Sequence, residues 1–161
     1  MIGMTLIVKT IAQWIKSFIF LYGVYITLYG HLTPGGGFAG GVIMVCSFIL
    51  LTLAFGKKKV LSKLSKALAS ELDSIGSLIF LAIATLGMSI GGVFFGNFIQ
   101  KNIPGREFAL LSAGMIPLCN IAIAIKVGSS LFMVFIILAV LRVVEKEGRL
   151  EMIQTEMRED E

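Results

Sequence analysis

The sequence predicts an all-α integral membrane protein with four spanning helices. Hydrophobic residues make up 57% of the 161 positions and charged residues only 15%, and the mean hydropathy is +0.93, well above what soluble domains show. One crossing needs about 20 apolar residues, so four spans use roughly half the chain. We expect spans at about 11–30, 38–55, 71–95 and 117–141, which make residues 1–141 a membrane domain and 142–161 a charged cytoplasmic tail that starts as a helix.

The first span is expected to be retained, because no small-residue cleavage site follows a short apolar core. Lys16 lies close enough to one end for its ammonium group to reach the membrane surface. Three tyrosines crowd the other half, as in an aromatic interface belt. Pro34 and Gly35 to Gly37 then permit a sharp reversal into the second span.

The second span is expected to end at three lysines, Lys57 to Lys59. From Val60 to Leu72, leucines recur every three or four residues with lysines on another face, which predicts a short amphipathic helix in the membrane interface. Ser70 and Asp73 match a capping box, so the third span is expected to begin near Glu71 and to continue to about Phe95.

The segment 97–116 has a mixed composition, and the sequence leaves open a short helix at about 107–112 or a re-entrant segment. Pro117 suits the first turn of the fourth helix. Of the 14 Lys and Arg residues, Lys101 and Arg106 fall on one side and Lys126 lies within a span, whereas the other eleven fall on the side of both termini. The positive-inside rule therefore predicts a multi-pass cell-membrane protein with both termini in the cytoplasm.

Lys126 is the residue most suggestive of function, because it lies near the middle of the fourth predicted span. A lysine facing lipid there costs at least about 2.5 to 3.5 kcal/mol. No Asp or Glu falls inside the predicted spans except at the cytoplasmic end of the third, where Asp73 lies. We therefore expect its partner to be Asn120, a water molecule or a carboxylate of another chain. Two roles stay open for Lys126: part of an ion or proton path, or a structural contact.

Glycines four residues apart predict close helix packing. The pairs considered are Gly36 with Gly40, Gly37 with Gly41, and Gly87 with Gly91. An alternative for the first of these segments is that residues 34–37 bind an anion through their backbone N–H groups, which are those of Gly35 to Gly37 because Pro34 has none.

The single histidine and the two cysteines have no neighbours that suggest a metal site. His31 lies at the outer end of the first span, where it could pass protons or be an ordinary interfacial residue. Cys46 and Cys119 are expected to pack inertly without a disulfide. We expect no active site, metal or cofactor in this chain, and no nucleic-acid partner, because the basic residues flank apolar segments.

Two segments resemble the MnhB/MrpB family. Residues 30–41, GHLTPGGGFAGG, resemble its GHxxPGGGFxGG signature, and residues 120–128, NIAIAIKVG, resemble its NxxIxxKVG stretch. The likeness covers most of residues 10–141. The family's lysine maps onto Lys126, its histidine onto His31 and its glycine-rich turn onto Pro34 to Gly41.

The resemblance implies a small subunit of an Mrp-type sodium/proton antiporter module without activity of its own. Homologues also belong to archaeal respiratory complexes, so the implied partners are other antiporter subunits, hydrogenase or sulfur-reductase subunits, and membrane lipid. The expected role is a contribution to Na⁺ or H⁺ translocation and assembly, most readily in a redox-driven complex such as a membrane-bound hydrogenase. Alternatives are a free-standing Mrp antiporter and a purely structural scaffold. In this hypothesis Lys126, His31 and Asn120 contribute to the ion path.

Overall fold

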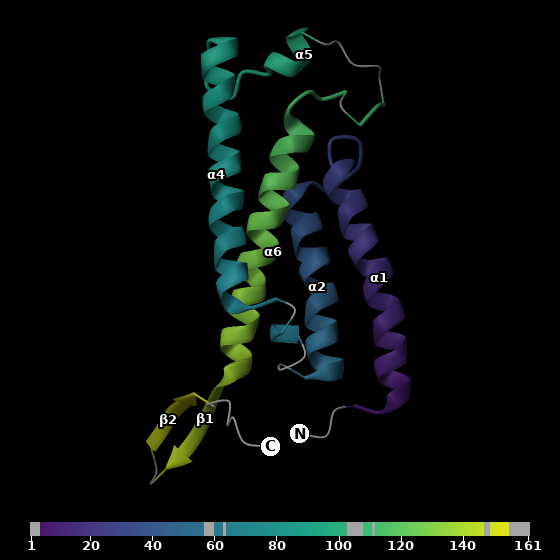
Figure 1. Cartoon of the computed structure of the whole chain (residues 1–161), viewed down its shortest axis with the longest axis vertical. Coiled ribbons are helices and arrows are strands. Elements are labelled where there is room, and N and C mark those ends of the chain that lie inside the picture. Colours follow the sequence, from purple (N-terminus) through teal and green to yellow (C-terminus); the bar gives the residue numbers. More distant parts are fainter. Residues whose placement is uncertain are drawn as a thin grey trace.

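Four long helices stand side by side in the order α1, α2, α6 and α4 (Figure 1). The computed structural model describes residues 4–56, 60–62, 64–102, 108–110, 112–146 and 149–154. Each long helix is sufficiently long and apolar to cross a membrane, which confirms the four predicted spans. The helices are α1 (Leu6–Leu28), α2 (Gly37–Phe55), α4 (Lys66–Gly91) and α6 (Ile116–Val140), with a short helix α5 (Phe98–Asn102) in the connection between α4 and α6.

Small residues bring α2 close to α1. A methyl group added at Gly40 would lie 2.8 Å from the carbonyl oxygen of Gly23 on α1, and one added at Gly23 would lie 3.0 Å from the backbone nitrogen of Met44 on α2. The buried Thr27 hydroxyl beside Gly40 donates to the Gly23 carbonyl at 2.9 Å, so it needs no outside partner. The two helices can therefore pack with their backbones almost in contact, as small residues allow in membranes.

An adjacent face of α2 meets α6 in the same way. A methyl group at Gly41 would lie 2.8 Å from the carbonyl oxygen of Ala124, and one at Gly37 would collide with the carbonyl oxygen of Asn120. The other predicted pair behaves differently, because Gly87 and Gly91 face Gly96 in the connection after α4.

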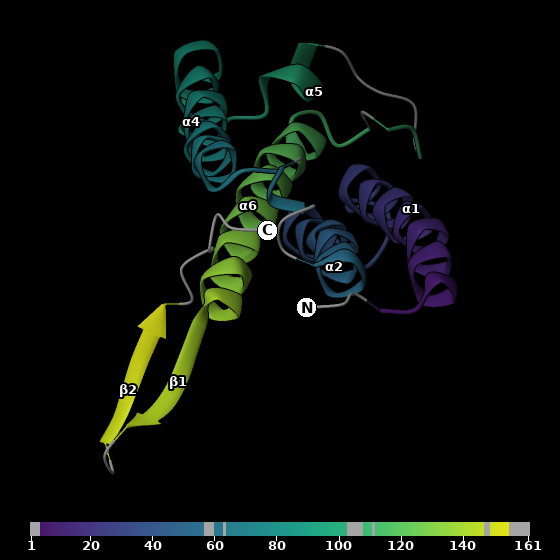
Figure 2. The ribbon, with the colours of Figure 1, turned by 60° about the horizontal axis from the view of Figure 1, so that its bottom comes forward.

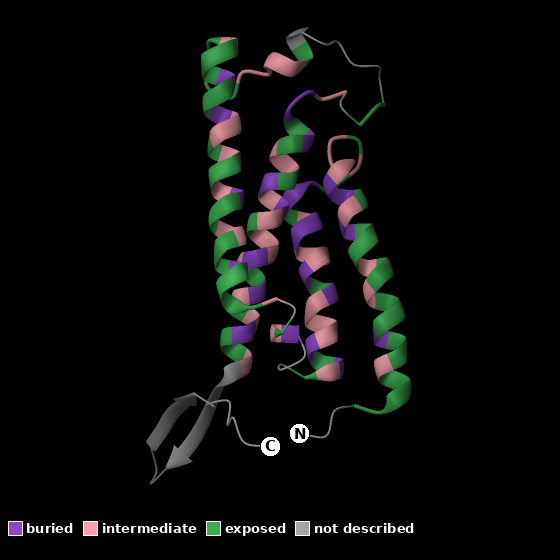
Figure 3. Cartoon of the chain, in the orientation of Figure 1, coloured by how far each residue is buried: buried purple, intermediate pink, exposed green. Residues whose placement is uncertain are grey.

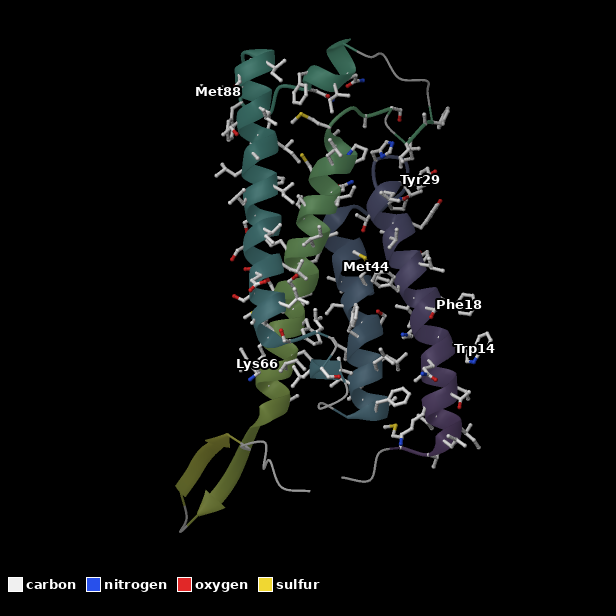
Figure 4. All side chains as sticks on the ribbon, in the orientation of Figure 1. Trp14, Phe18, Tyr29, Met44, Lys66 and Met88 are labelled. Carbon is white, nitrogen blue, oxygen red and sulfur yellow. The ribbon has the colours of Figure 1, made fainter. Side chains whose placement is uncertain are left out.

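A small apolar core joins α2, α4 and α6 near the end where α4 begins. It contains Val45, Val60, Ala69, Phe132 and Ile136, all almost completely buried. Figure 3 shows buried residues gathered where the helices face one another, and exposed residues over much of α1 and α4. On α1, Trp14 and Phe18 point away from the other helices (Figure 4) and are 70% and 69% exposed. Such apolar outer faces suit contact with lipid or with other membrane chains.

The third long helix begins earlier than predicted. Its N-cap is Ser65, whose hydroxyl accepts the backbone N–H of Leu68 at 3.1 Å, whereas Ser70 and Asp73 lie inside the helix. The expected capping box at Ser70 is therefore wrong, and the part of the expected interfacial helix from Lys66 to Leu72 belongs to α4. The physical reason is that residues 66–72 include good helix formers and no breaker, so the cap at Ser65 is followed by uninterrupted helix.

The connection between α4 and α6 also differs from expectation. Helix α4 ends at Gly91, followed by Gly92 in the left-handed conformation at a φ of 74°, rather than continuing to Phe95. A helix forms at Phe98–Asn102, whereas residues 108–110 of the expected helix at 107–112 form a turn, and 107 and 111 lie outside the described residues.

After α6 the chain forms an antiparallel hairpin of β1 (Leu141–Lys146) and β2 (Arg149–Gln154) instead of starting the tail as a helix. The hairpin projects beyond the end of α6 (Figure 2). Paired residues Lys146 and Arg149 are separated by two residues, Glu147 and Gly148. Two-residue connections containing glycine, next to β-branched residues such as Val143, favour a hairpin over a helix.

Candidate functional site

A salt bridge joins two of the membrane-spanning helices. The Lys126 ammonium group on α6 donates to Oδ1 of Asp73 on α4 at 3.0 Å. The Ser130 hydroxyl, also on α6, donates to the same carboxylate oxygen. We call these three residues the charged cluster.

The local sequence explains why the three side chains meet. Lys126 and Ser130 are four residues apart, so they lie one above the other on one face of α6. Gly76 lies three residues after Asp73, and a methyl group there would be 2.9 Å from both the Ala122 carbonyl oxygen and the Lys126 backbone nitrogen. The missing side chain at Gly76 thus lets α4 approach α6 closely enough for the salt bridge to form.

The charged cluster lies well inside both spans. Asp73 is seven residues after the start of α4, about 10 Å along the helix, and Lys126 is ten residues after the start of α6, about 15 Å along it. An isolated charge at such a depth is costly, and an opposite charge at hydrogen-bonding distance offsets much of that cost. Asp73 therefore gives Lys126 the counter-charge that a lysine in this position requires.

This pairing corrects the prediction for Lys126. The sequence predicts Asn120, a water molecule or a carboxylate of another chain as the partner, because the expected span boundary puts Asp73 at the end of the third span. Since α4 begins at Lys66 and not near Glu71, Asp73 lies about one and a half helical turns further in than predicted, and the long lysine side chain reaches it. The overlooked signals were the helix formers before Glu71, and Gly76 beside Asp73.

The salt bridge is only partly covered by this chain. The side chains of Lys126 and Asp73 are 47% and 33% exposed. Among the described residues, Oδ2 of Asp73 accepts no hydrogen bond and the Lys126 ammonium group makes only the one to Asp73. An ammonium group has three donors and a carboxylate oxygen can accept two hydrogen bonds, so the cluster retains unused hydrogen-bonding capacity.

The other predicted path residues lie elsewhere. The backbone of Asn120 borders Gly37, and its side-chain amide faces Gly36 at the start of α2, on the α2 side of α6. Nε2 of His31, in the turn between α1 and α2, lies 3.3 Å from the Ala109 carbonyl oxygen. Nδ1 of His31 is buried and has no hydrogen-bond partner among the described residues. No hydrogen bond between described residues connects either side chain to Lys126.

The remaining candidates form no second site. Cys46 and Cys119 are free thiols on different helices. Over the described ranges, no group of three or more His, Cys, Asp or Glu residues is placed to hold a metal ion. The charged cluster is therefore the arrangement in the described structure on which a functional hypothesis can be built.

The family comparison agrees with this layout. The sequence model described as "Domain related to MnhB subunit of Na+/H+ antiporter" matches residues 7–144, a range that includes all four spans and the charged cluster. The chain belongs to the MnhB family.

Relatives of this MnhB-family chain come from archaea and bacteria. It is 37% identical to an uncharacterised protein of Methanocaldococcus jannaschii over 127 residues, which cover 76% of this chain and 48% of that protein. It is 36% identical over 106 residues to a Staphylococcus epidermidis protein named as antiporter subunit mnhB2, covering 65% of this chain and 71% of the relative.

A solved structure contains a chain with the same fold. It belongs to the membrane-bound sulfane sulfur reductase, an archaeal respiratory membrane complex, and matches with a TM-score of 0.68 and 30% identity over 83% of this MnhB-family chain and 57% of that chain. The present chain thus spans about half the length of the archaeal relative and somewhat more of the sulfur-reductase chain.

Proposed function

We propose that this chain is a non-catalytic membrane subunit of a multisubunit sodium/proton antiporter module and that its charged cluster contributes to ion translocation. The observation that carries the proposal is the salt bridge between Asp73 and Lys126, which joins two membrane-spanning helices. Membership in the MnhB family supports the antiporter setting. Ionisable groups inside membrane spans commonly mark ion or proton pathways.

The geometry suggests how the cluster could act. Oδ1 of Asp73 accepts hydrogen bonds from both Lys126 and Ser130. A proton or a sodium ion that reaches the carboxylate competes with the lysine ammonium group for it and weakens the salt bridge. Release of Lys126 would then couple the arrival of one cation to the movement of another positive charge. Asn120 and His31 remain proposed contributors nearer the turn between α1 and α2.

We propose a redox-driven respiratory complex as the host, with both chain termini in the cytoplasm. The similarity to a chain of the sulfane sulfur reductase supports such a host, and a membrane-bound hydrogenase fits the same proposal. A free-standing antiporter is the alternative that the similarity to the Staphylococcus epidermidis subunit favours. In each case we expect other membrane subunits to be the partners.

The proposal is tested by ion transport in membrane vesicles that contain the assembled complex. We expect Lys126→Ala and Asp73→Asn to lower sodium-dependent proton transport strongly, and Lys126→Arg, which keeps the charge, to retain more transport. Lys16→Ala is the matched control, because this lysine lies on α1 and takes no part in the charged cluster. Normal transport by assembled Lys126→Ala complexes would show that the cluster serves only as a structural scaffold.

A further inference from the structure

Helix α4 has two different flanks beside its contact with α6. Gly76 and Ala69 are buried and mark the contact line itself. At 3.6 residues per turn, each residue advances about 100° around the helix, which separates the neighbouring positions into a polar and an apolar set. Asp73, Ser77 and Ser70 lie about 60° to 120° to one side of the contact line, and Ser74 lies further round toward the outward face, at about 160°; we call these four residues the polar flank. The apolar flank, on the other side, carries Leu72, Ile79, Ile83 and Leu86.

The serines of the polar flank satisfy part of their hydrogen bonding within α4. The Ser74 hydroxyl donates to the Ser70 carbonyl at 3.1 Å, and the Ser77 hydroxyl donates to the Asp73 carbonyl at 3.0 Å. Hydroxyl groups bonded in this way are tolerated inside a membrane. On this flank, the salt bridge between Asp73 and Lys126 therefore has the largest unused hydrogen-bonding capacity.

The salt bridge needs a polar partner that this chain does not give it in the described structure. Asp73 and Lys126 remain 33% and 47% exposed at the side of the helix row, with Oδ2 of Asp73 unbonded among the described residues. Lipid tails offer no hydrogen bonds, so lipid against this flank would leave both charges partly uncompensated. A hydrogen-bonding side chain of a neighbouring helix would complement both groups.

We infer that the polar flank of α4, together with Lys126, is the docking surface for a membrane-spanning helix of another subunit that brings a hydrogen-bonding side chain to the salt bridge. The inference rests on the proposed function in one respect, namely that this chain works within a larger complex. Ser70 and Ser74 are small and exposed, so they leave room for a second helix backbone to come close. The partner is thus recognised by polar complementarity as well as by apolar packing.

The test is site-specific photocrosslinking in the assembled complex. A benzoylphenylalanine replaces Ser74 on the polar flank, and in a matched control it replaces Ile79 on the apolar flank of the same helix. After irradiation of native membranes, we expect Ser74→benzoylphenylalanine to shift this chain into a heavier band that contains a second membrane subunit. The Ile79 control is expected to give a markedly weaker protein adduct. We also expect the Ser74 adduct to weaken when Asp73→Ala is added.

Three results would overturn the inference: lipid adducts alone from position 74, a stronger protein adduct from position 79, or an adduct from position 74 that Asp73→Ala leaves unchanged. The outcome is independent of the transport assay, because crosslinking reports proximity. An adduct from position 74 with normal transport by Lys126→Ala would contradict only the role in translocation. If position 74 gives no protein adduct while Lys126→Ala still abolishes transport, the result would contradict only the docking surface.

Discussion

Asp73 and Lys126 depend on each other because each is costly inside a membrane span without the other. Their 3.0 Å contact turns two opposite charges into a neutral pair, and Ser130 adds a further hydrogen bond to the carboxylate. Removing one member of such a pair leaves an uncompensated charge, whereas removing both leaves none. Single substitutions should therefore be more harmful than the double substitution.

This expectation can be measured by a double-mutant cycle on the detergent-solubilised chain. Asp73→Ala and Lys126→Ala should each lower the thermal unfolding midpoint, and the double variant should recover part of the loss. The coupling free energy between the two substitutions is about 0.5 to 3 kcal/mol for interacting residues. We expect a value near the lower end of this range, because the salt bridge is partly exposed. Strictly additive effects of the two substitutions would show that the salt bridge contributes nothing to stability.

At the scale of single residues, the sequence predicted Lys126 but neither Asp73 nor Ser130 as members of the charged cluster. A lysine in an apolar run is conspicuous, so Lys126 could be singled out and its need for a partner inferred. Asp73 could not be identified as the partner from the sequence, because its position at the end or in the interior of the span depends on where α4 begins. That boundary is marked by the Ser65 hydroxyl, which caps a run of helix formers by accepting the Leu68 N–H, and a competing match at Ser70 obscured it.

At the scale of whole elements, the contact between α4 and α6 depends on the missing side chain at Gly76. A methyl group there would lie 2.9 Å from backbone atoms of α6, which cannot move aside as a flexible side chain can. The two helices would have to separate or shift. Either change would lengthen the contact between Asp73 and Lys126.

We therefore expect Gly76→Ala to destabilise the chain by about 1 to 3 kcal/mol, the usual cost of overpacking. Gly91→Ala on the same helix is the control, because its methyl group would meet only ordinary contacts at 3.5 Å. Thermal unfolding in detergent measures both variants. Equal midpoints for the two variants would contradict the account of the α4–α6 contact.

Long apolar elements could be predicted, and their connections could not. Four runs of hydrophobic residues are a strong signal for four spans, and the described residues form four such helices. The hairpin after α6 depends on pairing between Leu141 and Gln154 and the residues between them. The abundant charges of this segment suggest a helical tail, and they outweigh the weaker hairpin signal of the two-residue connection at Glu147 and Gly148.

The arrangement of the helices in the whole molecule suits a subunit of a larger membrane complex. The helices stand in a row in which α4 packs along α6, so much of α4 is covered by no other long helix of the chain (Figures 1 and 3). One side of that surface is apolar and the other presents a partly exposed salt bridge. Such a surface gains stability from a partner that supplies both apolar packing and hydrogen bonds.

The most direct test of the central claim, that this chain is a subunit of an ion-translocating membrane complex, is to identify what it binds in its native membrane. The chain would be tagged, extracted in mild detergent and analysed by mass spectrometry. We expect large antiporter-type membrane subunits to co-purify with it. Co-purification of iron–sulfur or nickel-containing subunits as well would indicate a redox-driven complex. Co-purification of the antiporter-type subunits alone would indicate a free-standing antiporter. Recovery of the tagged chain without other membrane subunits would contradict the claim.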